Sequence, residues 1–128
     1  MSTSRKITIS VGRLVVQAEL NQTPCASAIL AALPLDATAN TWGDEVYFDI
    51  GVRHPLEKGA REDMAVGELG FWPSGRSLCI FFGPTPASDK DGPPRAASKV
   101  NPVGKIIGSH SVFGSVRDGD RISVTLAE

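Results

Sequence analysis

The segment from Gly67 to Pro86, GELGFWPSGRSLCIFFGPTP, constrains the fold more than any other part of the chain. It holds an apolar run with two aromatic residues, a Pro-Ser-Gly sequence, a second apolar run that ends in two phenylalanines, and a Pro-Thr-Pro exit. Proline and glycine between two apolar runs are typical of the turn in a β-hairpin. The segment therefore predicts two paired strands, Glu68 to Trp72 and Leu78 to Phe82, with the second in the middle of a sheet.

The rest of the chain has the same strand-rich pattern and one helical segment. Apolar and polar residues alternate from Lys6 to Leu20, which predicts a second hairpin. Thr23 and Pro24 are typical of a helix N-terminus, and apolar residues then recur at helical spacing until Pro34. Further strands are expected in three places: a pair around the Gly43-Asp44 turn within 35–50, a short strand at 103–107, and a last strand at 121–126.

Two connections interrupt this pattern. The stretch from Val52 to Val66 is polar and charged, and it is expected to be a long connection within one domain. The stretch from Gly83 to Pro102 holds five of the nine prolines and few apolar residues. It is expected to be a surface loop, either disordered or functional.

The size of the chain fits one domain over residues 1–128. A chain of 128 residues with 41% hydrophobic content buries roughly two-thirds of its unfolded surface. Seven or eight short strands leave exposed edges unless the sheet closes on itself. The pattern therefore predicts a mainly β fold in the form of a small closed barrel.

Charge and hydropathy exclude several classes of partner. The thirteen basic and fourteen acidic residues are scattered, so no nucleic-acid partner is expected. No apolar run approaches the roughly 20 residues that a membrane span needs, so no membrane partner is expected. The start MSTSRKITIS lacks the apolar core of a signal peptide, which predicts a cytoplasmic location.

The cysteines and histidines show no metal-binding pattern. Cys25 and Cys79 lie far apart and form no CxxC motif, so we expect both to be reduced and buried. His54 and His110 repeat no zinc-ligand spacing and are expected in loops or turns. No metal site and no cofactor are predicted.

Four segments resemble the cyclophilin-like proteins of bacteria and archaea, which share the fold of cyclophilins. The strongest matches are Gly67 to Gly75, with its aromatic-Trp-Pro sequence, and Leu78 to Pro86, with its FFGxTP sequence. Gly43 to Phe48 and Val100 to Ile106 also match, and the resemblance covers nearly the whole chain. It implies a closed eight-stranded antiparallel β-barrel with one or two short helices.

Cyclophilins catalyse rotation about Xaa-Pro bonds, whose barrier is about 18–20 kcal/mol. The resemblance implies that an isomerase would carry an arginine on a Phe-His-Arg strand. In this chain the matching strand reads Glu45-Val46-Tyr47-Phe48, and Arg53 and Arg76 match no catalytic position. Ordinary proline isomerase activity is therefore not expected.

Acidic residues stand near aromatic ones twice, at Glu45 with Tyr47 and at Glu68 with Phe71 and Trp72. Aromatic side chains with a few polar groups are typical of ligand pockets. The period of a strand places Glu45 and Tyr47 on one face, which we expect to look outward toward a groove, while Phe48 packs inward. The candidate ligand-binding residues are Glu45, Tyr47, Glu68, Trp72, Phe82 and Thr85.

Other interpretations stay open. Trp72 and Phe82 could be core residues, with the glutamates merely solvated. The favoured function is binding of a small molecule or a proline-containing peptide without chemistry. The alternatives are a proline isomerase with a rebuilt site, a catalyst that uses Glu45 and Glu68 for proton transfer, and a domain that assists a metabolic enzyme. Neither the catalytic residues nor the oligomeric state is predicted.

Overall fold

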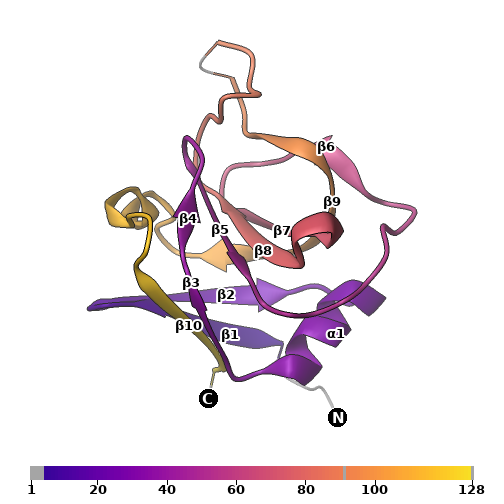
Figure 1. Cartoon of the computed structure of the whole chain (residues 1–128), viewed down its shortest axis with the longest axis vertical. Coiled ribbons are helices and arrows are strands. Elements are labelled where there is room, and N and C mark those ends of the chain that lie inside the picture. Colours follow the sequence, from indigo (N-terminus) through magenta and orange to yellow (C-terminus); the bar gives the residue numbers. More distant parts are fainter. Residues whose placement is uncertain (1–4, 91, 128) are drawn as a thin grey trace.

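The computed structural model describes residues 5–90 and 92–127. Within these ranges the chain forms ten strands, one α-helix and two 3-10 turns (Figure 1). In chain order these are β1 (Lys6–Val11), β2 (Leu14–Leu20), α1 (Pro24–Ala32), β3 (Leu35–Thr38), β4 (Asn40–Thr41), β5 (Glu45–Asp49), β6 (Arg61–Asp63), β7 (Glu68–Trp72), η1 (Pro73–Gly75), β8 (Ser77–Phe81), β9 (Arg95–Ile107), η2 (Ser111–Ser115) and β10 (Arg121–Leu126). The predicted mainly β fold with a short helix is confirmed.

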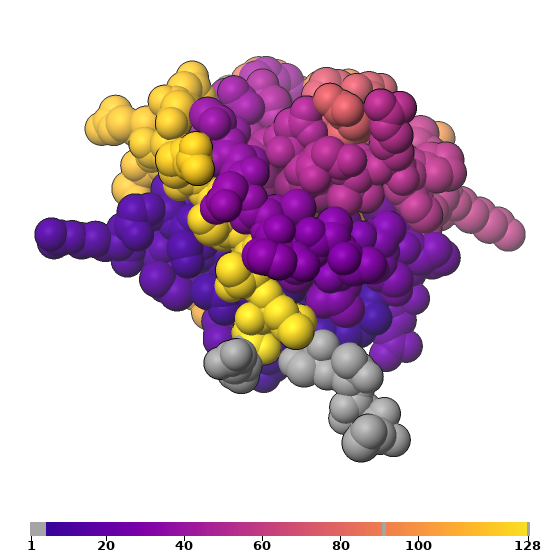
Figure 2. Space-filling model, turned by 60° about the horizontal axis from the view of Figure 1, so that its bottom comes forward, coloured from indigo at the N-terminus to yellow at the C-terminus, as the bar shows by residue number. Residues whose placement is uncertain are grey.

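The strands form one curled sheet with the order β3-β10-β1-β2-β9-β7-β8-β5-β4, and β6 pairs with β9 beside this path. The path starts at β3 and ends at β4, which are separated in the chain only by Ala39. Figure 2 shows β10, in yellow, crossing the surface between segments of the N-terminal third, as its pairing with β1 and β3 requires.

The predicted closed eight-stranded barrel is wrong in two respects. Ten strands are present among the described residues, and the hydrogen-bonded path is open. The reason lies in the extended segment of β3 and β4, which changes partner at Ala39: β3 pairs with β10, whereas β4 pairs with β5. One segment thus supplies both ends of the sheet, and the short strand β6 adds a pair that the sequence pattern did not reveal.

Two predictions from local sequence signals are confirmed: the start of the helix and the central position of β8. The Thr23 hydroxyl accepts a hydrogen bond from the backbone N–H of Ala26 at 3.2 Å, and Pro24 occupies the first turn of α1. Strand β8 pairs with β7 on one side and β5 on the other, so it lies centrally as predicted. No helix in the described ranges has the length and apolarity of a membrane span.

The long connections are more ordered than predicted. Strand β6 lies within the charged stretch 52–66, and β9 starts at Arg95, inside the stretch that was expected to be a loop as far as Pro102. Pro102 lies where the register between β7 and β9 shifts by one residue. Proline is tolerated at such a bulge because no ladder N–H is needed there.

Strands β5, β7 and β8 bury both of their faces. The inner face packs into the main core, which α1 and the other half of the sheet complete. On the outer face a smaller apolar cluster forms with β6 and the first half of β9; it comprises Met64, Cys79, Phe81, Ala96 and Val100, with Tyr47 and Trp72 packed against it. This second layer lies at the end of the molecule opposite α1 (Figure 1).

Candidate functional site

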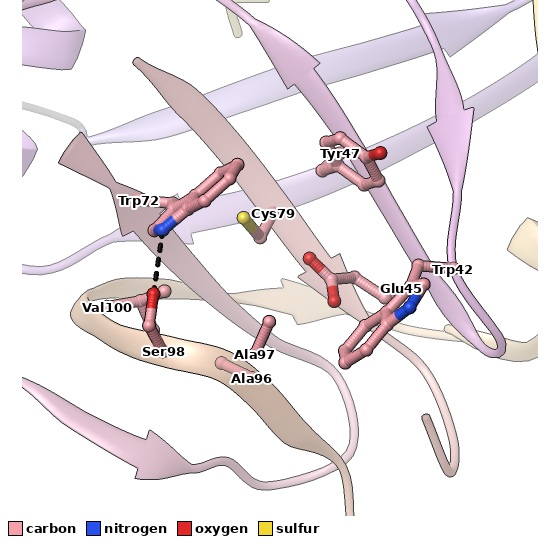
Figure 3. Close-up of a pocket in the computed structure, with 9 residues that line it drawn as sticks. All are labelled: Trp42, Glu45, Tyr47, Trp72, Cys79, Ala96, Ala97, Ser98 and Val100. Carbon is pink, nitrogen blue, oxygen red and sulfur yellow. Dashed lines mark hydrogen bonds between the residues drawn. The ribbon is translucent and has the colours of Figure 1, made fainter. Parts of the chain in front are cut away.

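A cavity of about 140 Å³ lies in the outer layer, between the face of β5, β8 and β7 and the first half of β9 (Figure 3). Its lining consists of Trp42, Glu45, Tyr47, Trp72, Cys79, Ala96, Ala97, Ser98 and Val100. Three of the six predicted ligand-binding residues, Glu45, Tyr47 and Trp72, thus meet in one place.

The strand registers bring the lining residues together. Glu45 and Tyr47 are two positions apart on β5, so they share its outer face. Tyr47 pairs with Cys79 on β8, and Cys79 pairs with Gly70 on β7. A side chain at Gly70 would place its Cβ only 2.7 Å from the Val100 side chain. The glycine therefore allows β9 to approach the sheet closely and to form the cavity wall.

The aromatic side chains are held at the two sides of the cavity. The indole N–H of Trp72 donates a hydrogen bond to the Ser98 hydroxyl at 2.9 Å, which ties β7 to β9. Trp42 lies in the turn before β5, where its backbone N–H donates to the Glu45 carbonyl at 2.9 Å. The next residue, Gly43, has a φ of +60°, and a Cβ there would lie 2.8 Å from Pro86. Figure 3 shows Glu45 between the two indole rings.

Glu45 is the one charged residue with a buried side chain in the described part of the chain, at 6% exposure. Burial raises the pKa of its carboxyl from 4.5 to about 7, and a hydrogen bond from the Cys79 thiol opposes this rise. No lysine, arginine or histidine of residues 5–90 and 92–127 forms an ion pair with it. At neutral pH the carboxyl is therefore divided between its protonated and ionised forms.

Comparison with known proteins identifies the fold family. The sequence profile of the cyclophilin-like family matches residues 5–125. The chain belongs to this family. The resemblance that the sequence motifs indicated is thus confirmed.

Two solved structures are similar to this cyclophilin-like chain. One is the solution structure of the hypothetical protein AF2241 from Archaeoglobus fulgidus, with 33% identity, a TM-score of 0.82, and coverage of 99% of this chain and 98% of that one. The other is the structure of McbB in complex with tryptophan, with 14% identity, a TM-score of 0.67 and coverage of 94% of this chain. This chain spans 44% of McbB, and the likeness there is one of fold alone. No curated protein matches the chain.

One thiol, that of Cys79, lines the cavity of this cyclophilin-like protein. Burial, together with the neighbouring Glu45 carboxyl, raises the pKa of the Cys79 thiol well above its ordinary value. A thiol that stays protonated at neutral pH is a poor nucleophile and a poor metal ligand. Cys25 and Cys79 are both buried and unbridged, as predicted. No group of three metal-ligating side chains occurs among the described residues.

The other three predicted ligand-binding residues lie outside this cavity. Glu68 forms an ion pair with Arg61 and accepts a hydrogen bond from the backbone N–H of Ala65, so it does not share a cavity with Glu45. The buried hydroxyl of Thr85 donates to the Arg95 carbonyl and anchors the proline-rich loop. The ring of Phe82 packs against Phe113, with their centroids 6.3 Å apart.

Several lining residues escaped the sequence analysis. Trp42 was noted only as a turn neighbour, although its place just before Gly43 puts it beside β5. Cys79 was expected to be buried, and its pairing with Tyr47 would have placed it on the outer face. Ala96, Ala97 and Ser98 lie in a segment that was expected to be a loop. The one sequence signal for this part of the lining was the run of small residues before Val100, because small side chains allow a strand to pack closely against a sheet.

Proposed function

We propose that this protein binds a small molecule in the Glu45 cavity, with an apolar group of about the size of one ring inside it. The observation that carries this proposal is the distribution of aromatic residues. The chain has two tryptophans and one tyrosine, and all three line this cavity. Tryptophan and tyrosine combine a large apolar surface with a polar tip, which suits a boundary between a ligand and water.

The size and polarity of the cavity support the same proposal. Its volume of about 140 Å³ is close to the roughly 150 Å³ of an engineered protein cavity that binds benzene. Ligand sites are mostly apolar with a few convergent polar groups. Here Glu45 provides the polar group, which can accept a hydrogen bond from a donor on the ligand or act as the counter-ion of a cation.

A proline isomerase is the weaker candidate. A twisted Xaa-Pro amide needs a donor or a cation to stabilise it, and catalysis by tenfold requires about 1.4 kcal/mol of such stabilisation. None of the nine residues that line the cavity is basic, and the ionised form of the Glu45 carboxyl has the wrong charge for this role. A proline-containing peptide therefore enters the test as a ligand whose isomerisation is not expected to be accelerated.

The experiment is an NMR titration of the whole chain with three probes: indole, tryptophan and a proline-containing tetrapeptide. Tryptophan is included because McbB, which shares the fold, has been solved in complex with it. We expect at least one probe to shift the indole N–H signals of Trp42 and Trp72. Exchange spectra of the tetrapeptide in the same samples report on its cis/trans interconversion.

Two variants sharpen this titration. Glu45→Gln keeps the size of the side chain, and we expect it to retain the fold while it weakens binding of probes that carry a donor. Asp49→Asn is the matched control, because it makes the same chemical change on the same strand where the side chain is 53% exposed. No shift of either indole signal by any probe would contradict the proposed function, and accelerated isomerisation would favour the alternative.

A further inference from the structure

Burial without an ion pair separates Glu45 from the other carboxylates of the described residues. Asp49, Glu57, Glu68, Asp63 and Asp89 each form an ion pair with an arginine or a histidine, and the carboxylates without one are less buried than Glu45. Glu45 is the carboxylate with the least solvent and has no such partner among the described residues. A buried carboxylate without a counter-ion is costly, and a cation brought by a ligand would remove that cost.

The rings around Glu45 provide a second feature that attracts cations. The faces of tryptophan and tyrosine rings carry negative charge density, and sets of such rings recognise quaternary ammonium groups. Trp42, Tyr47 and Trp72 surround the same ring-sized space as the Glu45 carboxyl (Figure 3). A group that fills this space contacts the carboxyl and the aromatic walls together.

We propose that the ligand is an organic cation, whose alkylated ammonium group occupies the cavity between Trp42, Tyr47 and Trp72 with Glu45 as its counter-ion. This inference rests on the proposed function, since it names the chemical class of ligand for the same cavity. A quaternary ammonium group is slightly smaller than benzene, so it fits the available volume. It also lacks hydrogen-bond donors, so the rings and the carboxylate suffice to hold it.

The protonation state of Glu45 should control this binding. The other titratable side chains that line the cavity are Tyr47 and Cys79, and no basic side chain lines it. The cation binds the ionised carboxyl, whose pKa burial has raised to about 7. Affinity for the cation should therefore rise as pH increases from 5.5 to 8, by about tenfold per unit well below the pKa, and should then level off.

The test compares choline with 3,3-dimethylbutan-1-ol, in which a carbon replaces the charged nitrogen. Neither compound absorbs where tryptophan does, and both tryptophans of the chain line the cavity, so intrinsic fluorescence reports binding directly. At pH 8 and constant ionic strength we expect choline to bind about tenfold more tightly than the alcohol. Glu45→Gln should bring the two affinities within about twofold, whereas Asp49→Asn should keep the original ratio.

The possible results separate this inference from the proposed function. If the alcohol binds as tightly as choline, or if indole binds and choline does not, the cavity is a ligand site but not a cation site, and the inference is overturned. If choline, the alcohol and all three probes of the NMR titration fail to bind, both proposals are overturned. Because the two probes are compared on the unaltered chain, a variant that failed to fold would leave the test decisive.

Discussion

The inner and outer faces of β5, β7 and β8 are built from alternate residues of the same short segments, yet they differ in chemistry. The inner face is wholly apolar and fully buried; its members are Val46, Phe48, Leu69, Phe71, Leu78 and Ile80. The outer face combines apolar side chains with a carboxyl, a thiol and an indole N–H, and it encloses a cavity. One sheet thus serves as a core wall on one side and as a candidate binding surface on the other.

The aromatic residue types differ in burial. Phe48, Phe71 and Phe113 are fully buried in the main core, and Phe81 is fully buried in the outer layer. The tryptophans and the tyrosine line the cavity, and each is only partly buried. Phenylalanine has no polar atom to satisfy, so it suits a dry core, while the polar tips of the other two suit a surface that meets water or a ligand. Among these aromatic residues, those with a polar tip are thus the ones that line the cavity.

Neighbouring alanine substitutions on β5 give the largest expected contrast. Phe48→Ala removes a fully buried ring and should lower the free energy of unfolding by about 3–5 kcal/mol. Tyr47→Ala removes a half-buried ring beside an existing cavity and should cost about 1 kcal/mol. Urea unfolding of both variants measures the difference. If both variants lost the same free energy of unfolding, the outer layer would be a second core, and the two faces of the sheet would not differ in their role.

The pH dependence of stability gives the next largest effect. Because burial raises the pKa of Glu45 from 4.5 to about 7, the folded chain holds this proton more tightly than the unfolded chain. Stability from this group is therefore greatest below pH 4.5 and is lost as pH rises toward 7, by roughly 3 kcal/mol. Glu45→Gln removes this dependence, because the amide does not titrate.

The measurement is the difference in unfolding free energy between Glu45→Gln and the unaltered chain at pH 4.5, 6 and 8. We expect the variant to gain in relative stability at each step. Hydrogen bonds from Thr41 lower the pKa of Asp118, so that group favours the folded state at higher pH and is unaltered in all three proteins. A difference that stays constant from pH 4.5 to 8 would argue against a carboxyl that is buried and unpaired.

The parts of the fold that the sequence predicted are those with local causes. The capping by Thr23 and the turn at Pro73–Gly75 each depend on a few consecutive residues. Strand β6 and the first half of β9 were missed because they stabilise each other across a long stretch of chain. Neither has a strong apolar alternation of its own, so pairing rather than propensity makes them strands.

The candidate site, like the fold, was predictable from the sequence only where local patterns determine it. Alternation along β5 placed Glu45 and Tyr47 together, and the Trp-Pro turn drew attention to Trp72. The burial of Glu45 was not predictable, since it depends on the ribbon of β6 and β9 that covers the face. Phe82 lies outside the cavity and packs against Phe113; it follows the end of β8, where alternation no longer determines the direction of a side chain.

The hydrogen bond between Trp72 and Ser98 offers the smallest and most discriminating test of the comparison. Ser98→Ala removes the acceptor of the indole N–H, and it should cost about 0.5–1.5 kcal/mol of unfolding free energy. Trp72 is half-buried, so water can replace the hydroxyl and the low end of this range is expected. Trp72→Phe removes the donor, and a double-mutant cycle with Ser98→Ala isolates the coupling between the two side chains. A coupling free energy well above about 1.5 kcal/mol would mean that β9 is held rigidly against the sheet, as the inner core is. A small coupling would fit a cavity wall that adjusts to its occupant.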